Sequence, residues 1–357
     1  MPFSHLHQFI FACVLTFVSV FALTPVLINI AHKYGTGIDY AHGNRKIHKI
    51  PVPRIGGIAI FIPFVVVNVI FYLVYQSEEV LKANQADFIY TILCSTMIFF
   101  LGLVDDFWSI SGGVKLVAQF SISLIFWYFL GGITHLHLPV LEFIRLPVWL
   151  SCFFTVFWLC GITNTINLID GMDGLSSGIV IIVSTCLAGL SYLTGLRWLF
   201  VVLSFLIISV IPFIVYNWHP ARVFVGDSGA YFFGFVIAAI SIHLCFNSDN
   251  SVLFYLPVIL LGLPITDTTY AIIRRLLGRN HLFNGDRKHL HHQLLSLGLS
   301  YHQTVIVLYG ISTFLAIVSM WCYFSTSETV IKTSVVLFLF ICCSIFLLSN
   351  SQKSRKE

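Results

Sequence analysis

The chain has 357 residues, of which 58% are hydrophobic and only 10% are charged, with a formal net charge of +4. A soluble domain carries about 25% charged residues, so this composition excludes an ordinary water-soluble protein. Phe alone accounts for 34 residues, which is too many for a water-facing surface. We therefore expect an integral membrane protein, and no nucleic-acid partner.

Apolar runs recur along the whole chain. An α-helix needs about 20 apolar residues to cross the hydrocarbon core of a bilayer. About eleven runs reach or approach this length, allowing for tilt. They cover residues 8–30, 56–75, 87–104, 114–132, 148–164, 175–193, 196–215, 229–247, 252–272, 303–324 and 329–349. This pattern predicts an all-α polytopic integral membrane protein, with residues 1–357 forming a single domain.

The basic residues of the loops predict the orientation. Of the 19 Lys and Arg residues, all but four fall on one side of the expected spans. The four exceptions are Lys82, Arg145, Arg197 and Lys332. The positive-inside rule then places the N-terminus outside and the C-terminus in the cytoplasm, which agrees with an odd number of spans. Because the first basic residue, Lys33, follows the first run, we interpret that run as an uncleaved anchor.

Six carboxylates lie at the cytoplasmic ends of apolar runs. They are Asp105, Asp106, Asp170, Asp173, Asp227 and Asp267. An ionised carboxylate beside hydrocarbon costs on the order of several kcal/mol, so a divalent cation with an anionic substrate is the expected compensation. A transporter would more often place such groups near the bilayer midplane. Their position at helix ends favours an enzyme at the cytoplasmic surface whose second substrate comes from the bilayer.

Two segments in the first third of the chain carry charge. Residues 45–57, R-K-I-H-K-I-P-V-P-R-I-G-G, would bind either anionic headgroups or the phosphate of a substrate. Asp105 and Asp106 are adjacent, so on a helix they point about 100° apart. One could approach a metal while the other orients a neighbouring cation; a solvated loop start is the alternative. Lys115 is a cation at the membrane edge, which snorkelling would also explain.

The segment 164–175, N-T-I-N-L-I-D-G-M-D-G-L, is the most specific in the chain. Asn167, Asp170 and Asp173 recur every third residue, which would group three oxygen ligands on one helical face or around one turn. Mg²⁺ prefers such ligands and keeps positions open for phosphate oxygens. The alternative is a polar turn with Asp caps.

A second polar segment, 216–229, reads Y-N-W-H-P-A-R-V-F-V-G-D-S-G. Asn217 and Asp227 flank its proline, and Asp227 would lie near the positive end of the following helix. An N-cap role would also explain Asp227. For His219 and Arg222, packing at the interface is as good an interpretation as function.

The largest predicted cytoplasmic loop contains N-G-D-R-K-H-L-H-H-Q-L-L at 284–295. Arg287, His289, His291 and His292 could bind phosphate or donate a proton. Zinc is disfavoured, because Asp286 is the only nearby acid and two of the histidines are adjacent. The leucines predict an amphipathic surface helix with its apolar face toward lipid, which is compatible with presentation of the histidines.

Five motifs in this order resemble those of the polyprenyl-phosphate N-acetylhexosamine-1-phosphate transferases, glycosyltransferase family 4. They are P-V-P-R-I-G-G, G-L-V-D-D, N-L-I-D-G-M-D-G-L, N-W-H-P-A-R-V-F-V-G-D-S-G and D-R-K-H-L-H-H, and they span residues 45–300. The H-L-H-H form is similar to the bacterial undecaprenyl-phosphate N-acetylglucosaminyl-1-phosphate transferase branch. The phospho-N-acetylmuramoyl-pentapeptide transferase branch usually has three successive histidines and then an acid, whereas Leu290 and Gln293 interrupt that pattern here. The eukaryotic dolichol branch tends to have Asn at the position of Asp173.

The resemblance implies an enzyme of the bacterial inner membrane. It would transfer N-acetylhexosamine-1-phosphate, above all GlcNAc-1-phosphate, from a UDP-sugar to undecaprenyl phosphate and release UMP. The product would begin a cell-envelope glycan such as an O-antigen, a common antigen or a teichoic-acid-type polymer. Mg²⁺ is the implied cofactor, with Mn²⁺ as the alternative ion, and a homodimer is left open.

The resemblance also implies a role for individual residues. The roles are catalysis by Asp105, Asp106, Asp170 and His289; substrate binding by Asp173, Asn217, Lys115, Arg287, His291, His292 and Lys49; and metal binding by Asn167 and Asp227. Phosphoryl transfer between two anions needs charge neutralisation and in-line positioning more than a strong nucleophile, which fits this mixture of acids, bases and metal. Direct attack by the lipid phosphate and a covalent Asp intermediate both stay open.

Three other activities compete with this interpretation. A phospho-N-acetylmuramoyl-pentapeptide transferase would share the fold and most motifs. A CDP-alcohol phosphotransferase would require D-G-x-x-A-R and two further Asp at four-residue spacing, which the chain lacks. An ion-coupled transporter would use the acids as relays.

Overall fold

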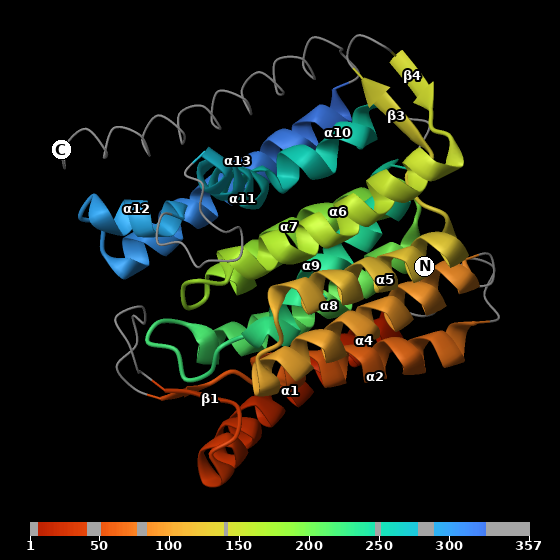
Figure 1. The fold of residues 1–357 in the computed structure, drawn as a ribbon. Coiled ribbons are helices and arrows are strands. Elements are labelled where there is room, and N and C mark those ends of the chain that lie inside the picture. The colour runs from red at the N-terminus through yellow and green to blue at the C-terminus, as the bar shows by residue number, and fades with distance from the viewer. Residues whose placement is uncertain are drawn as a thin grey trace.

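The computed structural model describes residues 6–40, 51–76, 84–138, 142–246, 251–277 and 289–325. Almost all of them lie in helices (Figure 1). The predicted run 329–349 and the predicted site residues Lys49 and Arg287 lie outside the described residues.

Long apolar helices form the body of the protein. They are α1 (Leu6–Tyr34), α2 (Gly56–Tyr75), α4 (Gln85–Trp108), α5 (Gly112–Leu130), α6 (Val148–Ile169), α7 (Leu175–Leu193), α8 (Arg197–Asn217), α9 (Gly226–Ser241, extended by a π-helix to Phe246) and α13 (Tyr301–Phe324). Within the described residues, these nine are long and apolar enough to cross a membrane. Each falls on one of the runs predicted from the sequence, so a polytopic membrane protein is confirmed.

The predicted run 252–272 is not one straight helix. It forms α10 (Ser251–Leu260) and α11 (Gly262–Leu277), and the pair is bent by 66° at Leu261. Pro264 has no N–H to donate back to Leu260, so a continuous α-helix cannot be satisfied there, whereas proline fits the first turn of a new helix. The hydropathy of the sequence does not reveal this break.

Short elements complete the fold. Two antiparallel ribbons pair β1 (Ile38–Asp39) with β2 (Val52–Pro53) and β3 (His135–Leu138) with β4 (Glu142–Arg145). A short helix of seven residues, α12 (Leu290–Ser296), precedes α13. The β1–β2 ribbon and α12 lie toward one end of the helix bundle, and the β3–β4 hairpin lies at the other (Figure 1). Within the described residues, the all-α prediction therefore missed these two small ribbons.

Helix α9 is the centre of the bundle. In its 18-residue apolar stretch 94% of the residues are buried, against 17% in that of α1. Helix α9 packs against α2, α4, α6 and α7. A helix that is apolar on all sides, such as the run A-Y-F-F-G-F-V-I-A-A-I, is expected to be enclosed by other helices. The start of α9 is thereby held among the ends of its neighbours.

Glycines allow those neighbours to approach closely. A Cβ added to Gly102 of α4 would lie 2.5 Å from the Cα atom of Ser228, and one added to Gly57 of α2 would lie 2.5 Å from the N atom of Gly229. Small residues at such crossings let helix backbones come together in a membrane. As a result, the acids at the end of α4 reach the first turn of α9.

Candidate functional site

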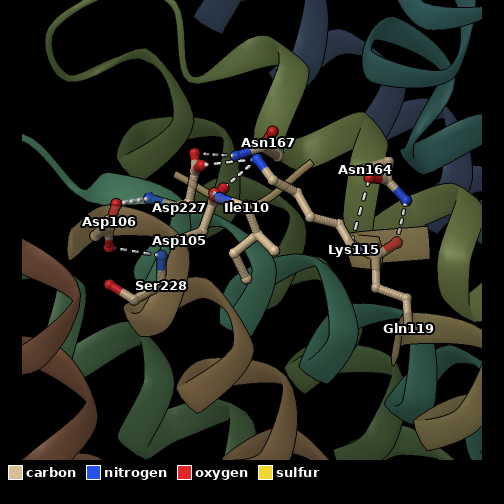
Figure 2. Close-up of polar contacts among 9 residues, drawn as sticks. All are labelled: Asp105, Asp106, Ile110, Lys115, Gln119, Asn164, Asn167, Asp227 and Ser228. Carbon is tan, nitrogen blue, oxygen red and sulfur yellow. Dashed lines mark hydrogen bonds and ion pairs between the residues drawn. The ribbon is translucent and has the colours of Figure 1, made fainter. Parts of the chain in front are cut away.

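The site lies where three helix ends meet. Asp105 and Asp106 come from the C-terminal end of α4, Asn167 from the C-terminal end of α6, and Asp227 from the first turn of α9. Figure 2 shows these side chains converging, with Lys115 reaching them from α5. The structure thus brings together residues that the sequence separates by up to 122 positions.

Asp106 caps helix α9. Its two carboxylate oxygens accept hydrogen bonds from the N–H groups of Asp227 (2.7 Å) and Ser228 (3.0 Å), which would otherwise lack partners at the helix start. A carboxylate at this end also interacts favourably with the helix dipole. Gly226, at φ 75°, admits the close turn before the helix. The N-cap role considered for Asp227 is therefore filled by Asp106 of α4. This capping fixes the backbone at Asp227 and hence the direction of its side chain.

Asp105 is buried and held from two sides. Its Oδ1 accepts a hydrogen bond from the N–H group of Ile110 (2.8 Å), because the chain turns back at Ser109 after α4. The ammonium group of Lys115 forms an ion pair with its Oδ2. The same ammonium group lies 3.7 Å from Oδ2 of Asp227, so one cation connects the two carboxylates (Figure 2).

Asp227 is also bound to α6. The side-chain N–H group of Asn167 donates to Oδ1 of Asp227 at 2.8 Å. One turn earlier on the same helix, Asn164 exchanges hydrogen bonds with Gln119 of α5 (2.6 and 3.4 Å), which ties α5 to α6 within the apolar interior. These contacts fix α5, α6 and α9 relative to one another.

The carboxylate cluster suits a hard divalent cation. Two acids held this close repel each other unless positive charge lies between them, and Lys115 already occupies such a position. Among the described residues no group of three or more His, Cys, Asp and Glu side chains could hold a metal. Mg²⁺ needs no such group, because it commonly takes one or two protein oxygens and completes its shell with phosphates and water. The oxygens of Asp227 and Asn167 fit that requirement.

A cavity of about 420 Å³ adjoins the cluster. Its lining includes Asp39, Arg54, Asn167, Asp170, Gly171, Asp173, Asn217, His219, Asp227, His289, His291, His292 and Tyr301. Asp227 and Asn167 thus face the cavity. Asp105, Asp106 and Lys115 do not line it; they contact Asp227 from the side of α4 and α5.

The turn between α6 and α7 contributes three of these residues. Asn167, Asp170 and Asp173 all line the cavity, as their spacing predicts, but each has a different partner. Helix α6 ends at Ile169, so the acids that follow are not on a shared helical face. Oδ1 of Asp170 accepts a hydrogen bond from the Ser176 hydroxyl group. The shared helical face is therefore excluded for Asp170 and Asp173, whereas their grouping around one turn agrees with the structure, and a common ligand role stays a prediction.

Asp173 and Asn217 tie this turn to the loop before α9. Asp173 accepts hydrogen bonds from Nδ1 of His219 (2.7 Å) and the N–H group of Ala221 (3.1 Å). Asn217 accepts from the N–H group of Gly174 (3.1 Å) and the Ser177 hydroxyl group (2.9 Å), and donates to the carbonyl group of Val223 (2.9 Å). These bonds indicate a positioning role. The substrate-binding role of Asp173 and Asn217 stays a prediction.

The histidines form another wall of the cavity. Nδ1 of His289 bonds to Oδ2 of Asp267 (2.9 Å), and Oδ1 of Asp267 accepts from the N–H group of Leu290 (2.7 Å) at the start of α12. His291 packs on the turn after α6, where a Cβ on Gly171 would lie 2.8 Å from its ring. Burial, with the neighbouring His292 ring, lowers the pKa of His291 to about 3, so this imidazole is neutral.

The short helix α12 lies where the sequence predicts an amphipathic helix. Its leucines were expected to face lipid, but Leu290 is buried against the hydrophobic core of the protein, whereas Leu297 is exposed. Asp267 was singled out in the sequence as one of six acids but was given no role; the structure places it as the partner of His289.

Sequence reasoning missed two residues of the cavity, Asp39 and Tyr301. Asp39 forms an ion pair with Arg54 (2.6 Å) across the β1–β2 ribbon. The ring of Tyr301 stacks on that of His219, with centroids 3.8 Å apart. Arg54 belongs to a motif that was noted, but Asp39 and Tyr301 are isolated polar residues in unremarked stretches, and no sequence signal points to them.

Comparisons with known proteins agree with the geometry. The model of glycosyl transferase family 4 matches residues 88–245, which contain Asp105, Asp106, Asn167 and Asp227. A probable undecaprenyl-phosphate N-acetylglucosaminyl 1-phosphate transferase of Bacillus subtilis is 35% identical over 351 residues, covering 96% of this chain and 89% of that protein. A phospho-N-acetylmuramoyl-pentapeptide-transferase of Staphylococcus aureus is 27% identical over 331 residues, 87% of this chain and 96% of that protein. The chain belongs to glycosyl transferase family 4, the polyprenyl-phosphate N-acetylhexosamine-1-phosphate transferases.

Proposed function

We propose that the protein transfers N-acetylglucosamine-1-phosphate from UDP-N-acetylglucosamine to undecaprenyl phosphate in the bacterial cytoplasmic membrane. One observation carries the proposal: Asp105, Lys115, Asn167 and Asp227, from four different helices, meet beside a cavity of about 420 Å³. Family membership and the activity named for the Bacillus subtilis relative support the same reaction.

The proposed reaction exchanges one phosphoanhydride bond for another. An oxygen of the lipid phosphate attacks the sugar-linked phosphorus of the donor, the bond to the bridging diphosphate oxygen breaks, and UMP leaves. Both reactants are anions, so the site must lower their repulsion and align them. Asn167 and Asp227 would hold Mg²⁺, or Mn²⁺ in its place, which when bound supplies neutralisation of the diphosphate charge.

The two sides of Asp227 suggest where each substrate lies. The cavity, lined by Asp173, His219 and the histidines of α12, is the proposed donor side. Asp105 and Lys115 lie on the other side, next to the exposed apolar side chains of Trp108 and Val114. Lys115 would attract the lipid phosphate there, and Asp105 would orient it or accept its proton.

UMP release by the purified protein tests the proposal. With Mg²⁺ and undecaprenyl phosphate, UDP-N-acetylglucosamine should yield UMP, and EDTA should stop the reaction until Mg²⁺ is restored. Asp227→Asn should lower the rate roughly 100-fold or more, because a charge aimed at the transfer site is lost. Asp87→Asn, at the opposite end of α4 from Asp105, is the matched control and should leave the rate unchanged.

The donor panel separates the competing activities. UDP-N-acetylgalactosamine and UDP-N-acetylmuramoyl-pentapeptide should release less UMP than UDP-N-acetylglucosamine does. Release with the pentapeptide donor alone would assign the activity named for the Staphylococcus aureus relative. Uptake of a solute by liposomes, with no UMP from any donor, would favour a transporter.

A further inference from the structure

We propose that Arg54, held by Asp39, is a phosphate-binding residue of the transfer site. The inference rests on the proposed function, because it assigns Arg54 to one of the two phosphate-bearing substrates of that reaction.

The geometry of the ion pair leaves donors for a second anion. Nε and Nη2 of Arg54 both donate to the same oxygen, Oδ2 of Asp39, at 3.1 and 2.6 Å. A guanidinium group has five N–H donors in a fixed plane, so a single carboxylate oxygen does not exhaust them. The side chain of Asp39 is 9% exposed and that of Arg54 is 44% exposed. The carboxylate is thus the buried anchor, and the guanidinium lines the cavity.

Backbone hydrogen bonds set Arg54 relative to Asp227. The N–H group of Arg54 bonds to the carbonyl group of Gly37 (2.7 Å). The residues around it join the segment before α9 through three further bonds: Phe224 N to Pro53 O (2.8 Å), Gly56 N to Phe224 O (3.0 Å) and Gly57 N to Val225 O (2.8 Å). A Cβ on Gly226 would lie 2.5 Å from the carbonyl oxygen of Arg54. The backbone of Arg54 is therefore fixed against Gly226, the residue before the proposed metal ligand Asp227.

The charge of the cavity requires such a residue. Among its described lining residues, four are acids, namely Asp39, Asp170, Asp173 and Asp227. Arg54 is the one guanidinium or ammonium group among these described residues, and the neutral ring of His291 cannot replace it. A planar guanidinium binds phosphate oxygens in pairs, which gives both attraction and orientation. Arg54 matches the chemistry of an incoming phosphate.

Kinetics of three variants test the assignment. Arg54→Gln should raise the KM of the substrate whose phosphate is bound by about 10- to 100-fold, the loss expected for a charge-assisted hydrogen bond. Arg54→Lys keeps the charge without the fork and should fall between Arg54→Gln and the wild type. Any effect of Asp39→Asn on that KM should disappear in the Arg54→Gln background, since Asp39 acts through Arg54. The matched control is Arg222→Gln, because Arg222 is an exposed arginine in the loop before α9 and does not line the cavity.

The two substrates are distinguished by which KM changes. A rise for the UDP-sugar assigns Arg54 to the diphosphate, and a rise for undecaprenyl phosphate assigns it to the acceptor. If active Arg54→Gln and Arg54→Lys enzymes kept the wild-type KM for both substrates, the inference would be overturned. The ion pair would then be structural, and its loss would lower only the unfolding temperature.

A binding measurement separates this inference from the proposed reaction. Inorganic pyrophosphate or phosphate should raise the unfolding temperature of the wild type and of Arg222→Gln, but not of Arg54→Gln. Stabilisation of Arg54→Gln equal to that of the wild type would overturn the anion site. A wild type that shows this dependence but releases no UMP would contradict the proposed function and keep the anion site.

Discussion

Asp170 occupies the turn between α6 and α7, where it faces other acids. Burial raises the pKa of its carboxyl group to about 8; the Ser176 hydroxyl group opposes the shift, and the nearby carboxylates of Asp227, Asp106 and Asp173 add to it. Asp170 is therefore largely protonated at neutral pH in the metal-free protein. A protonated carboxyl group cannot serve as a base, so the catalytic role predicted for Asp170 would depend on substrate or cation binding.

The stability of the protein should report this protonation. The pKa of Asp170 is raised from 3.8 to about 8 on folding, so its contribution is fully present below pH 3.8 and is lost as the pH rises to about 8. Asp170→Asn does not titrate. In EDTA, the unfolding temperature of the wild type should therefore fall relative to that of Asp170→Asn between pH 5 and 8 and then run parallel to it. A difference that stays constant from pH 5 to 9 would show that the carboxyl group is not protonated in the fold.

At the scale of helices, the site depends on how closely α4 approaches α9. Gly102 lies one turn before Asp105 and Asp106, and its Cα faces the backbone of Asp227 and Ser228. A methyl group there would lie 2.5 to 2.6 Å from three backbone atoms, which cannot move without displacing the start of α9. The cap made by Asp106 would lengthen, and Asp227 would lose its direction.

Gly102→Ala should therefore impair both activity and stability. We expect at least a tenfold loss of UMP release, since small misplacements of catalytic groups are costly, and a lower unfolding temperature. Gly161→Ala in α6 is the control, because a Cβ at Gly161 meets no atom within 4 Å and alanine favours helix. Full activity of Gly102→Ala would mean that the tight crossing is not needed to form the site.

The helices themselves follow from hydropathy, whereas their breaks and contacts do not. Runs of apolar residues predicted where α4 and α9 lie, because the bilayer sets a minimum length. The bend at Leu261 depends on the missing N–H group of Pro264, which a hydropathy window does not register. The capping of α9 by Asp106 joins residues 121 positions apart, and only the packing of two helices reveals it.

The site residues also divide into those that the sequence reveals and those that only the fold reveals. Acids at the ends of apolar runs stand out because burial of charge is costly, so Asp105 and Asp227 could be grouped from the sequence. Asn167 was found through its spacing from Asp170 and Asp173. Asp39 and Tyr301 could not be found in the sequence, because the fold creates the contacts that place them: Asp39 with Arg54, and Tyr301 with Asp173 and His219. The sequence could name acids but not distinguish those that face the cavity from those that hold other acids.

At the scale of the whole molecule, every part of the site lies at one end of the bundle. The ends of α4 and α6, the start of α9, the β1–β2 ribbon and α12 meet there, and the β3–β4 hairpin lies at the opposite end (Figure 1). The basic loops predict that the end with the site faces the cytoplasm. The account depends on this orientation, because the nucleotide-sugar donor must reach the cavity from the aqueous side.

Cysteine labelling tests that orientation most directly. In a cysteine-free background, Ser111→Cys and Leu297→Cys mark the end with the site, and Arg197→Cys marks the opposite end; all three positions are exposed. A membrane-impermeant maleimide added to intact spheroplasts should label Arg197→Cys, and should label Ser111→Cys and Leu297→Cys only after permeabilisation. Labelling of Ser111→Cys and Leu297→Cys from outside, with Arg197→Cys protected, would contradict the account.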